Sequence, residues 1–300
     1  MFEIPEQFIQ RMLVFHGVKG QAWIERLPAI LAACEQRWGL TIGTPFSNLS
    51  FHYVTAATNR DGEPVVVKAS SPTGEFPKEM EAVRLFDGHG MAQLQAFDTD
   101  DEVMVLERLL PGTLLQAVKD DEQAMSGAAS VMKQLWRPVP AGAPFPTVQD
   151  WGKGFTRLRQ HYDGGHGPFP KALLEQAERL FTELADSMAE PVLLHGDLHQ
   201  ENILAAQRHP WLAIDPKGLI GEPAYEIGAL LRNNLPLQMS SQKRVLARRV
   251  DQLAEELGLD RERIRCWGLA QAVLSVWWGV EDENRVYEET LIYAEALSQI

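Results

Sequence analysis

The densest polar chemistry of the chain lies in VLLHGDLHQENIL, residues 192–204, and in WLAIDPKG, residues 211–218. Each stretch opens with a short apolar run, which is typical of a buried strand, and continues into polar residues. Asp197 follows the first predicted strand, Asn202 comes five residues later, and Asp215 ends a strand of the next hairpin. Phosphoryl transfer needs a carboxylate that orients and deprotonates a hydroxyl, and oxygen ligands that hold Mg²⁺. The pattern therefore predicts such a site, with Asp197 as the base and Asn202 and Asp215 as the metal ligands.

The chain around these stretches has a strand-rich first third and a mostly helical remainder. Apolar residues at helical spacing predict helices over residues 3–38, broken at Gly17 and Gly20. A mostly antiparallel sheet with one inserted helix is expected next, and the turn at residues 59–62 indicates a hairpin within it. The expected strands of this sheet are 40–46, 51–58, 64–69, 92–97 and 103–106, and the inserted helix is 78–86.

A small β region interrupts the helical half of the chain. Helices are expected after Pro111-Gly112, apart from strands at 192–194, 202–205 and 211–215. This order predicts an α+β, protein-kinase-like fold of two lobes. Residues 1–108 are the expected nucleotide-binding lobe, a small antiparallel sheet with N-terminal helices. Residues 109–300 are the expected helical lobe for catalysis and substrate binding.

The run HGDLHxEN with the following IDP resembles the catalytic and metal-binding loops of the aminoglycoside phosphotransferase family. Residues 192–204 and 211–233 are most similar to its streptomycin and hydroxyurea phosphotransferase branch, whose members are antibiotic resistance kinases. The strand VVVK at 65–68 resembles the family's phosphate-binding lysine strand, and KEMEA at 78–82 resembles the helix that supplies the partner of this lysine. The run LERL at 106–109 is similar to the hinge that receives adenine.

The resemblance implies a role for each matching residue. Asp197 would be the catalytic base, and Asn202 and Asp215 would hold Mg²⁺. The ammonium group of Lys68 would contact the α- and β-phosphates of the nucleotide. Its partner would be Glu79, with Glu81 as a rival, because residues two apart on a helix face different ways. The resemblance also implies that His195 supports the catalytic loop through hydrogen bonds, and we expect this role and not proton transfer.

The expected nucleotide is ATP, with GTP as an alternative. No GxGxxG precedes Lys68, and the hairpin loop that would cover the phosphates offers backbone amides and the hydroxyls of Ser47 and Ser50. The backbone of Glu107 and Leu109 would bind adenine. Asp215 is followed by Pro-Lys-Gly and not by Phe-Gly, which disfavours a protein kinase with a switchable activation loop.

The expected partner is a small cationic or polyhydroxylated molecule, and neither nucleic acid nor a membrane. The formal charge is −13, and nucleic-acid binding needs clustered Lys and Arg. The same charge would steer a cationic substrate, although acidic proteins are also common for reasons of solubility. In this family, carboxylates of the helical lobe bind the ammonium or guanidinium groups of the substrate. The candidates are Glu222, Glu226, Glu281 and Asp282, followed by Asp150 and Glu175.

The predicted location is the cytoplasm. Cys34 and Cys266 are the only cysteines, so the chain has no disulfide framework, and its first residues do not resemble a secretory signal. The apolar stretch 267–280 is too short to span a bilayer. Its tryptophans are expected in the core more than on a substrate shelf.

Together, the motifs and the resemblance predict a kinase that transfers the γ-phosphate of ATP to a hydroxyl of a streptomycin-like aminoglycoside or a related polar metabolite. One alternative is a metabolic kinase of another small alcohol, such as an amino sugar, choline or homoserine. A second treats His195, Asp197 and His199 as metal ligands of a hydrolase, and a third is a nucleotide-binding module without catalysis.

Overall fold

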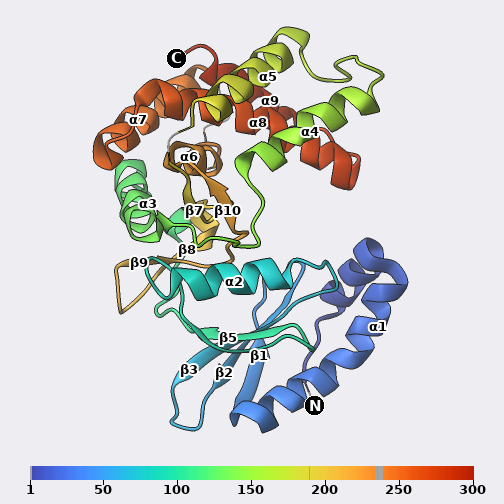
Figure 1. Cartoon of the computed structure of the whole chain (residues 1–300). Helices are drawn as coiled ribbons and strands as arrows, with labels where there is room; N and C mark the ends of the chain where they lie inside the picture. The colour runs from blue at the N-terminus through green and yellow to red at the C-terminus, as the bar shows by residue number, and fades with distance from the viewer. Residues whose placement is uncertain (1, 189, 234, 236–238) are drawn as a thin grey trace. The chain divides into compact units, whose positions relative to one another are not determined.

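The computed structural model describes residues 2–188, 190–233, 235 and 239–300, and the chain divides into two compact units (Figure 1). The first unit is Met1–Gly112 and the second is Thr113–Ile300. The first unit ends four residues beyond the boundary expected at residue 108. Gly112 lies in a tight turn at this boundary, since an added Cβ would lie 2.9 Å from the carbonyl oxygen of Leu109.

The first unit is built on a five-stranded antiparallel sheet in the order β1-β2-β3-β5-β4. The expected antiparallel sheet with one inserted helix is therefore confirmed, with shifts of a few residues at some element ends. Its elements are α1 (Glu6–Trp38), β1 (Thr41–Pro45), β2 (Tyr53–Thr58), β3 (Pro64–Ala69), α2 (Phe76–Phe86), β4 (Leu94–Asp98) and β5 (Val103–Glu107).

The N-terminal helix α1 is bent at one of the two predicted glycines. Gly17 has φ 51° and ψ −129°, a conformation that residues other than glycine rarely adopt. Gly20, also predicted as a break, is instead helical and buried. It is needed for close packing across the bend, because an added Cβ would lie 2.3 Å from the carbonyl oxygen of Met12.

Different helices supply the contacts on the two faces of the sheet. Side chains such as Tyr53, Val65 and Val67 form a buried core with Trp23 and Leu27 of α1. Since side chains of a strand alternate between the two faces, Lys68 points to the opposite face, where α2 supplies its partner. The helix α1 thus closes one face of the sheet and leaves the lysine face to α2.

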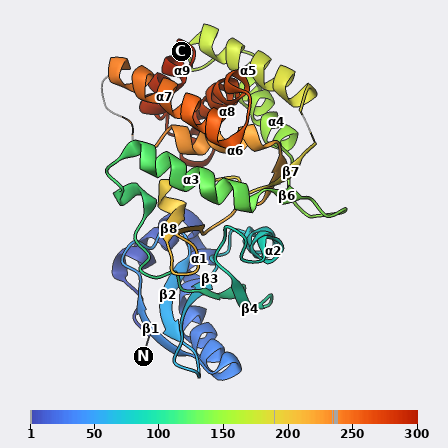
Figure 2. The same ribbon diagram turned by 90° about the vertical axis from the view of Figure 1, so that its left-hand side faces the viewer.

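The second unit is mainly helical, and α8 is buried along most of its length (Figure 2). Trp267 and Trp277 are in the core, as expected, whereas Trp278 is half-buried. None of the described helices combines the length and apolar character needed to cross a membrane. The helices are α3 (Asp121–Leu135), α4 (Val148–His161), α5 (Lys171–Asp186), α6 (Pro223–Leu231), α7 (Met239–Leu257), α8 (Arg261–Glu283) and α9 (Glu288–Leu297), with short 3₁₀ turns η1 (Leu115–Ala117) and η2 (Gln200–Asn202).

The β region of the second unit consists of two small sheets. The hairpin β8–β9 is one, and β10-β7-β6 is the other. The sequence predicts three of these strands and misses β6 and β10, which are two and three residues long and carry too little pattern to detect. The strands are β6 (Arg137–Pro138), β7 (Val192–Leu194), β8 (Ile203–Ala205), β9 (Trp211–Ala213) and β10 (Leu219–Gly221).

Replacement of Gly20 tests the close packing at the bend of α1. An alanine in a helix normally stabilises by about 1 kcal/mol relative to glycine. Here the backbone oxygen of Met12 blocks the added methyl group, so we expect Gly20→Ala to lower the free energy of unfolding by about 1–3 kcal/mol. Urea denaturation measures the change, with the exposed neighbour Gln21→Ala as the control. A stabilised Gly20→Ala variant would contradict this packing.

Candidate active site

The loop that carries Asp197 begins where β7 ends, and a buried histidine holds it. His195 is fully buried. Its Nδ1 lies 3.3 Å from the backbone nitrogen of Asp197, and its Nε2 lies 2.8 Å from the carbonyl oxygen of Ile214. Because a backbone N–H can only donate, Nδ1 accepts and Nε2 carries the proton. Burial lowers the pKa of His195 to about 4, so this neutral ring supports the loop, as expected.

A buried carboxylate also holds this loop through backbone hydrogen bonds. Glu226, on α6, is only 1% exposed, and its two oxygens accept the backbone N–H groups of His195 at 2.6 Å and of Gly196 at 3.0 Å. Burial raises the pKa of Glu226 to about 7. The sequence-based proposal that Glu226 binds substrate is wrong, because both oxygens are used inside the protein.

Gly196 is required at the turn between the buried histidine and Asp197. Its φ is 86°, which favours glycine. An added Cβ would lie 3.3 Å from the Cβ atoms of Lys217 and Leu219, and 3.4 Å from the ring of Trp151. The chain is therefore confined on three sides where it turns to present Asp197.

Asp197 itself is partly open to solvent, with 31% of its side chain exposed. Its Oδ1 lies 3.9 Å from Nη2 of Arg232, and its Oδ2 lies 3.9 Å from Nε2 of His199. The sequence motifs do not point to Arg232. It is the C-cap of α6 and is 35 positions from Asp197 in the chain, so no short motif links the two.

A hairpin brings the two predicted metal ligands together. Ile203 pairs with Ala213 across β8–β9, and the N–H of Ile214 donates to the carbonyl oxygen of Asn202 at 2.9 Å. Asn202 and Asp215 consequently lie at neighbouring positions at the open end of the hairpin. Asp215 has φ 58°, in the left-handed region that is unusual for a residue other than glycine.

The donor atoms at this end of the hairpin suit Mg²⁺. Nδ2 of Asn202 donates to the carbonyl oxygen of Asp197 at 3.0 Å, so Oδ1 is the atom that this amide can offer to a cation. Asp215 is exposed and adds a carboxylate. Magnesium prefers such oxygen ligands and is commonly held by one or two carboxylates together with substrate phosphates. The residues present therefore fit the predicted ion.

The hydrolase alternative does not agree with this geometry. Both ring nitrogens of His195 are engaged with backbone groups, so neither is available to coordinate zinc. Within the described part of the chain, no cluster of three or more His, Cys, Asp and Glu side chains is arranged to hold a metal.

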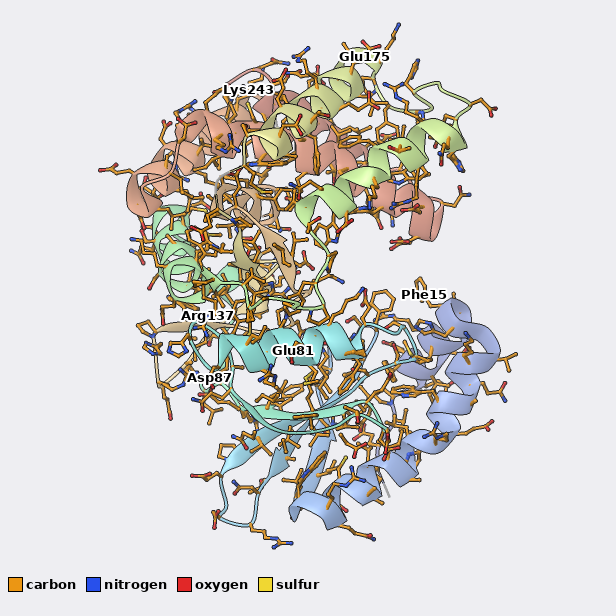
Figure 3. All side chains as sticks on the ribbon, in the orientation of Figure 1. Phe15, Glu81, Asp87, Arg137, Glu175 and Lys243 are labelled. Atoms are coloured by element: carbon orange, nitrogen blue, oxygen red, sulfur yellow. The ribbon has the colours of Figure 1, made fainter. Side chains whose placement is uncertain are left out.

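In the first unit, the predicted lysine pairs with the predicted glutamate. Nζ of Lys68 on β3 lies 2.5 Å from Oε1 of Glu79 on α2, and both side chains are buried. The rival Glu81 instead binds Arg84 with both oxygens, at 2.6 and 2.7 Å. Figure 3 labels Glu81 on α2. The structure thus decides between the two candidates in favour of Glu79.

The helical pattern of α2 contains the signal that distinguishes them. Phe76, Val83 and Phe86 are buried, and Glu79 lies three residues after the first and four before the second. Residues with these spacings share one face of a helix, whereas Glu81 lies on another. An apolar face read from Phe76 onward would have selected Glu79 from the sequence.

The other predicted nucleotide contacts lie at two places in the first unit. Ser47 and Ser50 are exposed in the loop between β1 and β2. Glu107 ends β5, where its backbone N–H donates to the carbonyl oxygen of Gln93 and its side chain accepts the N–H of Gln93. Leu109 is buried just beyond this strand. Their roles with nucleotide stay predictions.

The prediction that Glu222 binds substrate is also wrong, because this carboxylate is buried and bonded within the protein. It is 3% exposed, accepts Nε of Arg263 at 2.7 and 2.8 Å, and is bonded by the indole N–H of Trp267. Glu281 forms a bidentate pair with Arg157 near the end of α8, next to Asp282. Asp150 caps α4 and binds Lys153, and Glu175 lies on α5 near Lys171. No contact tests these four as substrate ligands.

The sheet with its buried Lys–Glu pair and the histidine-supported aspartate loop together define a phosphotransferase with a protein-kinase-like fold. Comparison with known sequences makes the class more specific. Residues 37–283 match the profile of a family described as aminoglycoside/hydroxyurea antibiotic resistance kinase. The chain belongs to this family.

Individual relatives cover nearly the whole chain. It is 32% identical to a streptomycin 6-kinase of Streptomyces glaucescens, over 99% of this chain and 97% of the relative. It is also 32% identical to a hydroxyurea phosphotransferase of Kitasatospora aureofaciens, over 98% of this chain and 86% of that protein. A crystal structure of aminoglycoside phosphotransferase APH(4)-Ia with ADP and hygromycin B shares the fold, with a TM-score of 0.63, 16% identity, and coverage of 89% of this chain and 96% of that one.

Acid should weaken the contribution of His195 to stability. Its folded-state pKa of about 4 lies below the ordinary value of 6.5, so between these values the unfolded chain binds the extra proton. Stability from the buried neutral ring is therefore complete above pH 6.5 and is lost as the pH falls towards 4, at up to about 1.4 kcal/mol per pH unit. Urea denaturation of the wild type and His195→Gln from pH 7 to 4.5 should show a shrinking difference. A difference that stays constant would contradict the assignment.

Proposed function

We propose that the chain transfers the γ-phosphate of ATP to a hydroxyl group of a streptomycin-like aminoglycoside. The observation that carries the proposal is the placement of Asp197 on a doubly anchored loop, with Asn202 and Asp215 adjacent on one hairpin. The similarity to streptomycin 6-kinase supports the acceptor. The formal charge of −13 supports a cationic acceptor, which it attracts from solution.

In the proposed reaction, Asp197 receives the hydroxyl of the acceptor as a hydrogen-bond donor. The hydroxyl oxygen forms a bond to the γ-phosphorus while the bond from this phosphorus to the β,γ-bridging oxygen breaks, and ADP leaves. The hydroxyl proton passes to the carboxylate of Asp197. Because the transition state of phosphoryl transfer is loose, the main contributions of the protein are position and charge.

The other proposed roles concern the nucleotide. The ammonium group of Lys68 binds the α- and β-phosphates, and Glu79 keeps it in place. Asn202 and Asp215 hold Mg²⁺, which when bound neutralises charge on the phosphates. The Ser47–Ser50 loop covers the phosphates, and the backbone of Glu107 and Leu109 binds the base. Glu281 and Asp282, at the end of α8, remain the proposed contacts to the acceptor.

A second acceptor follows from the equal similarity to hydroxyurea phosphotransferase. Hydroxyurea is a small neutral molecule, so charge attraction would contribute nothing to its binding. Salt therefore separates the two acceptors. Raising the ionic strength should lower kcat/KM for a cationic aminoglycoside and leave that for hydroxyurea unchanged.

The reaction is tested by the release of ADP, with mass spectrometry of the product, across streptomycin, other aminoglycosides, amino alcohols and hydroxyurea. We expect a mass increase of one phosphoryl group on one of these acceptors. Asp197→Asn should lower kcat by about 10²–10⁴-fold, as for loss of a general base. Asp251→Asn, an exposed aspartate paired with Arg261, is the control. The proposal fails if the wild type phosphorylates no acceptor, or if Asp197→Asn keeps full activity.

The two glutamates of α2 provide a matched comparison for nucleotide binding. Glu79→Gln removes the negative charge 2.5 Å from the buried ammonium group of Lys68, which should cost about 3–5 kcal/mol of stability and raise KM for ATP. Glu81→Gln breaks an exposed pair, so its effect should be below about 1 kcal/mol.

A double variant separates stability from ATP binding. Lys68→Met with Glu79→Leu replaces the buried ion pair by apolar side chains, which is often neutral for stability. We expect this variant to fold like the wild type. Its affinity for ATP, measured by isothermal calorimetry, should nevertheless be lower than that of the wild type. Wild-type affinity for ATP in this variant would refute the proposed role of the pair.

A further inference from the structure

Arg232 is a cationic side chain next to the carboxylate of Asp197, and the proposed reaction has so far given it no part. Its Nη2 lies 3.9 Å from Oδ1, and its side chain is 23% exposed. The opposite oxygen of the carboxylate, Oδ2, faces His199. The two oxygens of Asp197 therefore have different surroundings, with the guanidinium group of Arg232 beside Oδ1 and the imidazole of His199 beside Oδ2.

The backbone that carries Arg232 is bonded to a buried side chain. Arg232 caps α6, and the carbonyl oxygens on either side of it, of Leu231 and Asn233, accept Nη1 of Arg249 at 2.9 and 2.6 Å. Arg249 is fully buried and forms a bidentate pair with Asp121 of α3. The turn that carries Arg232 is thus tied to α3 and α7 through a buried ion pair.

The side chain of Arg232 is held at a second point. Its Nη1 donates to Oε1 of Gln271 at 3.4 Å, and Gln271 is itself 3% exposed on α8. One end of the guanidinium fork therefore rests on a buried amide, while the other end faces Asp197. An arginine placed only for solubility would not need such support.

Charge explains why Asp197 needs a neighbour of this kind. In the proposed reaction, the carboxylate must stay within hydrogen-bond distance of a hydroxyl while a phosphoryl group with several negative charges approaches the same oxygen. Repulsion between the carboxylate and that group raises the energy of the arrangement. The positive charge of Arg232 offsets part of this repulsion and, through its attraction for Oδ1, keeps the carboxylate in one orientation. A displacement of about 1 Å at a reacting group can cost about 100-fold in rate.

We propose that Arg232 is a positioning residue for Asp197, which attracts Oδ1 by its charge and so fixes the orientation in which the carboxylate meets the acceptor hydroxyl. The inference rests on the proposed phosphotransfer and adds a residue from the end of α6 to it. It predicts that Arg232 acts on turnover and not on the binding of either substrate.

The first test is steady-state kinetics of Arg232→Met, which removes the charge, and of Arg232→Gln, which also keeps an N–H donor for Gln271. Both should lower kcat about 10–100-fold, with KM for ATP and for the acceptor within about 3-fold of the wild type. Arg232→Lys keeps the charge and should recover a large part of kcat. Arg179→Met, on the exposed surface of α5, is the matched control and should behave like the wild type.

The second test combines the variants with Asp197→Asn. If Arg232 works through Asp197, then Arg232→Gln should lower the residual rate of the Asp197→Asn enzyme by less than about 2-fold. A full additional loss in the double variant, an unchanged kcat in Arg232→Gln, or a large rise in KM for the acceptor would each overturn the inference. Thermal unfolding establishes that every variant is folded before its kinetics are compared.

The outcomes for Arg232 and for the proposed function are separate. Wild-type protein that phosphorylates no acceptor contradicts the proposed function. Active wild type with an equally active Arg232→Gln contradicts only the role of Arg232.

Discussion

Two backbone N–H groups, those of His195 and Gly196, end on the single buried carboxylate of Glu226. This interaction fixes the end of β7 and the start of the loop that presents Asp197. A carboxylate in such a place is expensive to desolvate, and its raised pKa shows that cost. Hydrogen bonds from two backbone donors offset it, because they satisfy both oxygens with charge-assisted contacts.

The residue next to this carboxylate, His195, connects it to the rest of the site through hydrogen bonds of its imidazole ring. Its Nδ1 sets the backbone of Asp197, and its Nε2 reaches Ile214 on the far side of the loop, one residue before Asp215. The base and one metal ligand of the proposed site are therefore supported by one neutral ring. The first unit uses a different arrangement, a buried ion pair between Lys68 and Glu79, which keeps the charge that the proposed contact with phosphate needs.

The sequence predicts those parts of the structure that depend on local pattern. The antiparallel sheet, the helix α2 and the loop around Asp197 follow from strand-like and helical runs and from a motif of adjacent residues. Glu226 and Arg232 could not be assigned in this way. Their partners are 30 or more positions away, and only the path of α6 beneath the loop brings them together. Glu222 and Glu226 carry the carboxylates expected of ligands for a cationic substrate. Only their burial in the structure shows that both form hydrogen bonds within the protein instead.

The two ends of the β8–β9 hairpin differ in how freely they can change in sequence. Asn202 and Asp215 lie at its open end, where strand pairing and the contact of Ile214 keep them adjacent. Its tip, residues 207–210, is exposed. Surface turns of this kind tolerate changes in length because their backbone is solvated. During divergence of the family, this tip can therefore gain or lose residues while the distance between Asn202 and Asp215 is preserved.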